Sequence, residues 1–102
     1  MQFQTHNDTE IDVIGTHLQG YIQADYAKLV KHFGEPFEGT YKTDWEWSLR
    51  FDNGAIATIY NWKNGPNYQG DHGYHNDQIF EWHVGGFDQQ ALRQVMSALQ
   101  GA

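Results

Sequence analysis

The stretch over residues 40–65, TYKTDWEWSLRFDNGAIATIYNWKNG, constrains the fold more than any other part of the chain. Apolar and polar side chains alternate over residues 44–52, and this period of two is typical of a half-buried strand rather than a helix. The dipeptide Asn53-Gly54 follows, and it favours a two-residue type I′ turn, because both central residues of that turn need a positive φ. Residues 55–62 are rich in β-branched and aromatic side chains, which suit a return strand. The sequence therefore predicts a β-hairpin with an aromatic face.

A two-residue turn also fixes which side chains face one another across the predicted hairpin. The expected pairs are Phe51 with Ile56, Leu49 with Thr58, Trp47 with Tyr60, Trp45 with Trp62, and Asp44 with Lys63. The large rings then gather at the open end of the hairpin, where Lys42 and Lys63 also fall. Stacking rings beside cations are what a planar, anionic ligand such as a nucleotide needs.

The whole chain, residues 1–102, predicts a single compact α+β domain. Strands are also expected within residues 10–22, as one interrupted strand or two short ones, and over residues 79–84. Helices are expected after Asp25 and Asp88, which are suitable N-caps. The order β-α-β-β-β-α predicts a small antiparallel sheet of three to five strands, with two short helices packed on one face.

Charge and composition narrow the classes of function. The chain carries 13 acidic and 6 basic residues, for a net charge of −7, which argues against direct binding to nucleic acid or to an anionic membrane surface. A basic protein surface is the kind of partner that this charge favours. The absence of cysteine suits a reducing cytosol. With no apolar run of roughly 18 residues and no N-terminal signal pattern, we expect a cytoplasmic protein.

Residues 63–78, KNGPNYQGDHGYHNDQ, form a long polar segment without an aliphatic residue. Long loops without secondary structure are often lids or binding loops, so we expect Tyr68 and Tyr74 to close over the ring cluster. His72 and His75 have a spacing found in metal sites, but the sequence offers no obvious third and fourth ligand, so no metal site is expected.

Two pairs of titratable side chains resemble acid–base pairs. Asp44 and Glu46 share one strand face, and Glu81 and His83 share another, but alternation also places such charges on the solvated face of a one-sided sheet. No nucleophile or phosphate-loop motif is present, so we expect no catalytic residue and no cofactor. The predicted ligand-binding residues are Lys42, Trp45, Tyr60, Trp62, Lys63, Tyr68 and Tyr74.

Four blocks of sequence resemble segments of short, mostly uncharacterised proteins encoded by bacteriophages and prophages. The blocks are LVKHFGEP (29–36), YKTDWEW (41–47), ATIYNWK (57–63) and EWHVGG (81–86), and the resemblance extends from about Ile14 to Val95. It implies a viral protein that acts in the host cytosol against antiviral defence, as anti-CRISPR proteins and sponges for cyclic-nucleotide signals do.

Three hypotheses about function result from these features. Rings beside lysines favour a phage anti-defence protein that sequesters a small nucleotide-type immune signal without turnover. The net charge of −7 favours an alternative, an acidic inhibitor that occupies a basic, nucleic-acid-binding surface of a host defence protein. A small hydrolase that uses Asp, Glu and His is the third. Exposed aromatic surface also predicts a homodimer or a higher homo-oligomer.

Overall fold

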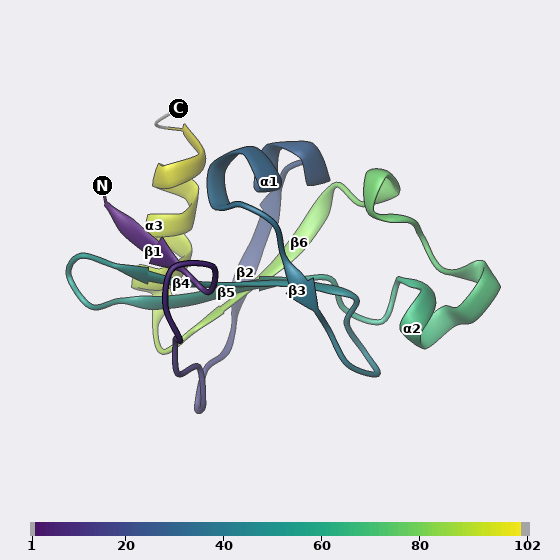
Figure 1. Ribbon diagram of the computed structural model, residues 1–102, viewed down its shortest axis with the longest axis horizontal. Coiled ribbons are helices and arrows are strands. Elements are labelled where there is room, and N and C mark those ends of the chain that lie inside the picture. Colours follow the sequence, from purple (N-terminus) through teal and green to yellow (C-terminus); the bar gives the residue numbers. More distant parts are fainter. Residues whose placement is uncertain (1, 101–102) are drawn as a thin grey trace.

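The computed structural model describes residues 2–100, which form a six-stranded antiparallel sheet and three α-helices (Figure 1). The strands are β1 (Phe3–Thr5), β2 (His17–Gln23), β3 (Phe37–Glu38), β4 (Trp45–Phe51), β5 (Ile56–Tyr60) and β6 (Glu81–Gly86). The helices are α1 (Tyr26–Phe33), α2 (Pro66–Gln69) and α3 (Gln89–Gln100), and two 3₁₀ turns, Gly70–His72 and Asn76–Gln78, follow α2. The predicted α+β class is confirmed, but the predicted numbers of strands and helices are too low.

The strand order across the sheet is β1-β4-β5-β6-β2, and β3 pairs with β4 on the same edge as β1. β1 has three residues and β3 has two, so both are too short for an alternating pattern to reveal them. Residues 10–14 lie outside every strand of the sheet, and the strand predicted there is wrong. Residues 18–22 lie within β2, as predicted.

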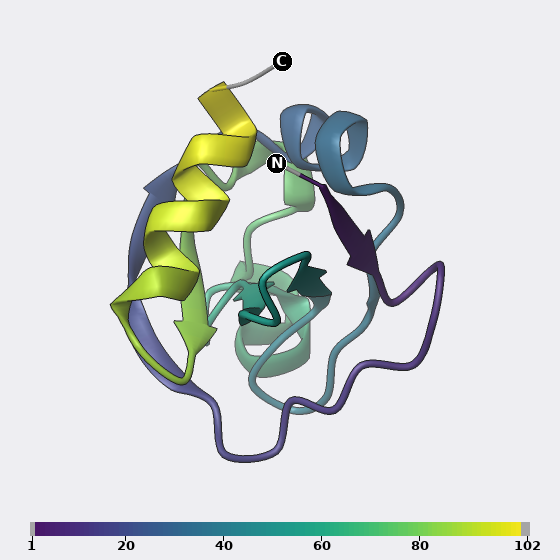
Figure 2. The same ribbon diagram turned by 90° about the vertical axis from the view of Figure 1, so that its left-hand side faces the viewer.

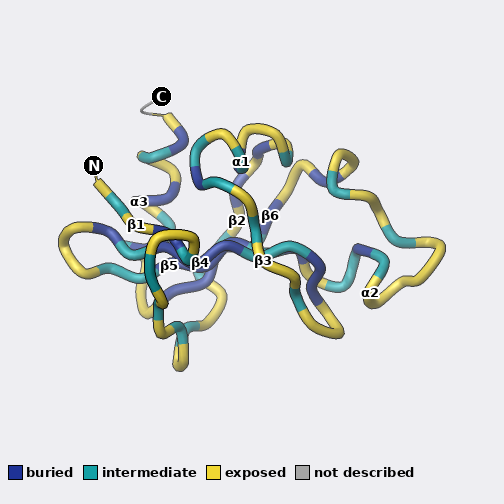
Figure 3. The backbone as a smooth tube through the Cα atoms, viewed as in Figure 1, coloured by how far each residue is buried: buried dark blue, intermediate teal, exposed yellow. Residues whose placement is uncertain are grey.

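The helices α1 and α3 pack on one face of the sheet (Figures 1 and 2). Their buried side chains meet those of β4, β5 and β6 in one hydrophobic core, which appears as the dark segments of Figure 3. α1 begins where predicted, because Asp25 Oδ1 accepts a hydrogen bond from Lys28 N at 2.8 Å. α3 begins after Asp88, whose Oδ1 accepts from Gln90 N at 3.0 Å. Neither helix covers the opposite face of the sheet.

The β4–β5 hairpin exists, but its turn differs from the predicted one. Phe51 N donates to Ala55 O at 2.9 Å and Gly54 N donates to Phe51 O at 2.8 Å, so residues 52–54 form a three-residue loop. Gly54 has a φ of 90°, and Asn53 is not among the described residues with positive φ. This geometry is a type I turn followed by a glycine bulge. The prediction of a two-residue turn is wrong because an Asn-Gly pair is compatible with the type I′ turn and also with this three-residue loop. Glycine adopts a left-handed conformation in both.

The extra turn residue shifts the register by one position and reverses which side chains share a face. Tyr60 lies opposite Glu46 rather than opposite Trp47. The predicted pairs of Trp47 with Tyr60 and of Trp45 with Trp62 are therefore wrong. Trp47 is buried beneath the helices, while Tyr60 points to the open face. The single predicted ring cluster is in fact two clusters on opposite sides of the sheet.

Replacing Gly54 with alanine tests the turn. A Cβ at this position meets nothing within 4 Å, so the cost is purely conformational, and we expect Gly54→Ala to lower the free energy of unfolding by roughly 1 kcal/mol. Gly54→Asn should recover part of the loss, because asparagine tolerates the left-handed region better than alanine. Urea denaturation measures both variants, and a Gly54→Ala protein as stable as the parent would contradict the turn geometry.

Candidate functional site

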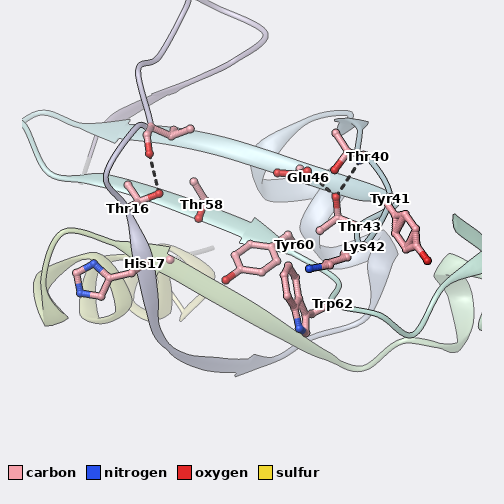
Figure 4. A pocket seen from close by; sticks show the side chains of 12 residues that line it. Thr16, His17, Thr40, Tyr41, Lys42, Thr43, Glu46, Thr58, Tyr60 and Trp62 are labelled. Carbon is pink, nitrogen blue, oxygen red and sulfur yellow. Dashed lines mark hydrogen bonds between the residues drawn. The ribbon is translucent and has the colours of Figure 1, made fainter. Parts of the chain in front are cut away.

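A cavity of about 480 Å³ opens on the face of the sheet that α1 and α3 leave uncovered (Figure 4). Its floor consists of Glu46 on β4, Thr58 and Tyr60 on β5, and Gly85 on β6. Val13, Thr16 and His17 form one wall as the chain enters β2, and residues 40–43 between β3 and β4 form the other. The site is thus assembled on the central strands by two loops far apart in the sequence.

Gly85 keeps the floor of the cavity open. A Cβ at this position would lie 2.4 Å from Thr58 Oγ1 and 3.5 Å from Tyr60 Cε1. Gly85 pairs with Thr58 across the β5–β6 ladder, so the missing side chain leaves space directly beside the Tyr60 ring.

Aromatic rings line the open face at one end of the cavity. The ring centroids of Tyr60 and Trp62 are 6.1 Å apart in an edge-to-face arrangement. His83 on β6 lies 5.4 Å from the Tyr60 ring, and Tyr21 on β2 lies 4.9 Å beyond His83. Trp62 is 41% exposed, so its indole surface is accessible to a ligand that stacks.

Two lysines lie against the Trp62 indole. Lys42 Nζ is 5.5 Å and Lys63 Nζ is 5.7 Å from the Trp62 ring centroid, which is within cation–π range. Their backbones are joined, because Lys63 N donates to Lys42 O at 2.7 Å. Lys63 has a φ of 60°, a conformation that non-glycine residues rarely adopt. Two cations are thereby held next to an exposed indole.

The buried side-chain amide of Asn61 links the two segments that carry these lysines through hydrogen bonds. Asn61 Oδ1 accepts from Asp44 N at 2.7 Å and from Trp45 N at 3.1 Å, and Asn61 Nδ2 donates to Asp44 Oδ1 at 3.0 Å. Asp44 Oδ2 in turn accepts from Asn67 N at 2.9 Å, and Asn67 Nδ2 donates to Thr43 O at 2.7 Å. The start of β4 and the chain that follows β5 are therefore fixed to each other.

The Glu46 carboxylate is held in place by a chain of hydrogen bonds in the wall of the cavity. Thr43 Oγ1 donates to Glu46 Oε2 at 2.6 Å and accepts from Thr40 N at 3.2 Å. Figure 4 shows these bonds beside the Tyr60 ring. Glu46 thus presents a fixed hydrogen-bond acceptor to the cavity.

Burial changes the pKa values of two rings in this cluster. Burial lowers the pKa of His83 below its usual 6.5, and the nearby Glu81 carboxylate opposes the shift. His83 Nδ1 is buried without a hydrogen-bond partner. Burial also raises the pKa of Tyr60 above 10.0, with further contributions from Glu46 and Tyr21. Both rings are thus uncharged at neutral pH.

Three of the predicted ligand-binding residues, Lys42, Tyr60 and Trp62, line the cavity together. Lys63 lies beside them against Trp62, and its Nζ is also 5.5 Å from the ring of Tyr68. Tyr68 contacts Tyr41, at the outer edge of the cavity wall, with ring centroids 5.3 Å apart.

The other two predicted residues, Trp45 and Tyr74, lie away from the cavity. Trp45 packs 6.2 Å from the Tyr26 ring on the helix-covered side, because the register places it there. Tyr74 is 55% exposed, and no residue of the segment 63–78 is among the described residues that line the cavity. This segment contains α2 and two 3₁₀ turns, so it is more ordered than the loop that the sequence predicted.

No sequence pattern pointed to the wall that contains Thr16 and His17, whose side chains line the cavity. Glu46 and Thr58 also line it, and period-two alternation would have identified them if the register had been correct. Gly85 lies just beyond the strand predicted over residues 79–84, whereas β6 in fact extends through it to Gly86.

Glu81 and His83 share no hydrogen bond within residues 2–100. Glu81 Oε2 accepts from Gln23 Nε2 at 2.7 Å, and His83 Nδ1 has no partner. Among residues 2–100, no group of three or more His, Cys, Asp or Glu side chains is arranged to hold a metal ion. Within the same part of the chain, no helix has the length and hydropathy required to cross a membrane.

Comparisons of the chain with protein-family models, with curated proteins and with solved structures found no match.

Replacing Asn61 with alanine should strongly destabilise the fold. The change leaves the backbone N–H groups of Asp44 and Trp45 without their acceptor in a buried environment, and we expect a loss of about 2–3 kcal/mol in the free energy of unfolding. Gln69→Ala is the matched control, because this exposed amide makes one hydrogen bond, to Lys63 O. Thermal and urea unfolding compare the two variants, and equal effects would contradict the role of Asn61.

The pKa of His83 makes stability depend on pH. The unfolded chain binds a proton at His83 near pH 6.5, whereas the folded chain binds it only at lower pH, so the free energy of unfolding falls as pH drops below about 6.5. The loss stops once the pH is below the folded-state pKa. An NMR titration of the His83 ring should give a pKa under 6.5, and His83→Gln should flatten the pH dependence between pH 5 and 7. The exposed residue His72 provides the control variant, His72→Gln.

Proposed function

We propose that this protein binds a small nucleotide-type ligand in the open-face cavity and does not convert it. The observation that carries the proposal is the placement of an exposed indole, Trp62, and a cation, Lys42, in one cavity with the Tyr60 ring. A nucleotide offers the complementary pair of groups, a flat base and a phosphate.

The size and lining of the cavity support this ligand class. A volume of about 480 Å³ lies within the range of small-molecule sites, which are mostly apolar with a few placed polar groups. Here the apolar surface is aromatic, and the polar groups include the hydroxyls of Thr16, Thr40 and Thr58 beside Lys42. Hydroxyls of this kind suit the sugar and phosphate oxygens of a nucleotide.

Ligand binding involves a rearrangement of Lys42. Without ligand its ammonium group lies 5.5 Å from the Trp62 ring centroid, a contact that contributes about 0.5–1 kcal/mol at an exposed site. A stacked base replaces that contact, and the freed ammonium forms a charge-assisted hydrogen bond with phosphate, which is stronger. The exchange favours an anionic planar ligand over a neutral one.

Capture without turnover is favoured over hydrolysis by the state of the acidic groups. Glu46, the carboxylate in the cavity, is hydrogen-bonded to Thr43 and has no histidine partner among residues 2–100. Glu81 accepts from Gln23 rather than from His83, so the conceivable carboxylate–histidine pair does not form. In biological terms we propose a phage anti-defence protein that sequesters a nucleotide-type immune signal, on the basis of the sequence resemblance described above.

The net charge of −7 favours the second candidate, an acidic inhibitor of a host defence protein with a basic surface. This candidate does not require the cavity, so variants of the cavity distinguish the two functions.

Calorimetry on purified protein tests the proposal with a panel of cyclic dinucleotides, ADP-ribose derivatives and nucleoside monophosphates. We expect at least one to bind with a dissociation constant on the order of micromolar. Trp62→Ala should weaken that binding by about 5- to 150-fold, equivalent to the ~1–3 kcal/mol of a base–aromatic stack. It should leave the fold intact, because Trp62 is 41% exposed.

Phe80→Ala is the matched control, since Phe80 is an aromatic residue, 59% exposed, that does not line the cavity. Its binding should equal that of the parent protein. No heat from any nucleotide, together with tight capture of a basic host effector, would favour the acidic inhibitor instead. A chemically altered nucleotide recovered after incubation would indicate the hydrolase.

A further inference from the structure

We infer that the base recognised in this cavity is guanine and that Glu46 selects it. This inference rests on the proposed function, and it assigns a ligand chemistry to a residue for which strand alternation predicts only a solvated face.

Glu46 is fixed in position before any ligand arrives. Its Oε2 accepts from Thr43 Oγ1 at 2.6 Å, and Thr43 Oγ1 is fixed by Thr40 N at 3.2 Å. The hydrogen bonds among residues 2–100 leave Glu46 Oε1 without a donor, so this oxygen remains available to a ligand. Glu46 is only partly exposed, which limits competition from water for the same oxygen.

Glu46 and the Tyr60 ring are neighbours. Glu46 pairs with Tyr60 across the β4–β5 ladder, and both side chains line the cavity floor. Paired residues of an antiparallel ladder have Cβ atoms about 4.5–5.5 Å apart. A base that lies against the Tyr60 ring therefore brings one of its edges to the Glu46 carboxylate.

A carboxylate only accepts hydrogen bonds and can accept two side by side. Guanine presents two adjacent donors on its Watson–Crick edge, N1–H and the N2 amino group. Adenine and cytosine each present one amino group next to a bare ring nitrogen, which repels the carboxylate. Uracil presents a single N–H between two carbonyls. Guanine is the base whose edge matches Glu46.

The same carboxylate fixes the direction in which the ligand lies. A phosphate beside Glu46 would suffer like-charge repulsion, whereas one near Trp62 lies within reach of Lys42 and Lys63. The base therefore stacks on Trp62 beside the Tyr60 ring, with its Watson–Crick edge toward Glu46, and the phosphate lies at the lysine end.

The test is calorimetric titration of the parent protein and Glu46→Gln with GMP, IMP, AMP and 2′-deoxy-GMP. We expect the parent to bind GMP at least about tenfold more tightly than AMP, with IMP between them because it lacks the N2 amino group. Glu46→Gln keeps an acceptor for Thr43 but replaces one ligand acceptor with a donor. GMP binding should then weaken by about tenfold or more, and AMP binding should be unchanged or tighter.

Thr43 acts through Glu46 as a positioning residue, and it provides a second measurement. Thr43→Val removes the hydrogen bond to Glu46 with little change in volume, so the ratio of GMP to AMP affinity should fall. Thr43→Ser retains the hydroxyl and should restore the ratio. A change in stability alone would weaken the binding of GMP and AMP equally and leave the ratio of their affinities unchanged.

Several results would overturn the inference. Equal weakening of GMP, IMP and AMP by Glu46→Gln, with 2′-deoxy-GMP binding unchanged, would assign Glu46 to the ribose while leaving nucleotide binding intact. A parent protein that binds AMP as tightly as GMP would also remove guanine selection and leave the proposed function standing. Binding of none of these nucleotides, and of none in the wider panel, would overturn the proposed function and the inference together.

Discussion

The register of the β4–β5 hairpin is the constraint on which the rest of the molecule depends. The three-residue loop that ends at Gly54 places Tyr60 opposite Glu46. Trp47 is consequently in the core beneath α1 and α3, and Tyr60 with Trp62 is on the other side of the sheet. Because strand side chains alternate, a slip of one residue would exchange these two sets and remove both the core and the cavity.

The buried Asn61 amide has a different role, because it joins parts of the chain that the sheet does not join. It binds the backbone at the start of β4, and through Asp44 it reaches Asn67 at the beginning of α2. Burying a polar group costs free energy unless its hydrogen bonds are made. Loss of any one of the Asn61 hydrogen bonds would therefore strongly destabilise the fold. That requirement explains how a polar, glycine-containing segment holds a defined path beside the Trp62 indole.

The sequence was sufficient for features governed by local chemistry. The N-caps at Asp25 and Asp88, the α+β class and the existence of the hairpin follow from residue type and periodicity. Register was not predictable, because Asn-Gly fits two turns that differ by one residue. The wall at Thr16 and His17 was not predictable either, because only tertiary packing brings an irregular segment next to a loop more than twenty residues away.

The left-handed backbone at Lys63 has an evolutionary consequence. With a φ of 60°, this position would be occupied with less strain by glycine, and the side chain that is present there lowers stability by an amount on the order of 1 kcal/mol. Selection for a more stable chain would replace the lysine with glycine and thereby remove one of the two cations beside Trp62. The stability of this fold and the positive charge beside its cavity are thus opposed at a single residue, so variants selected for thermal resistance alone should tend to lose that charge.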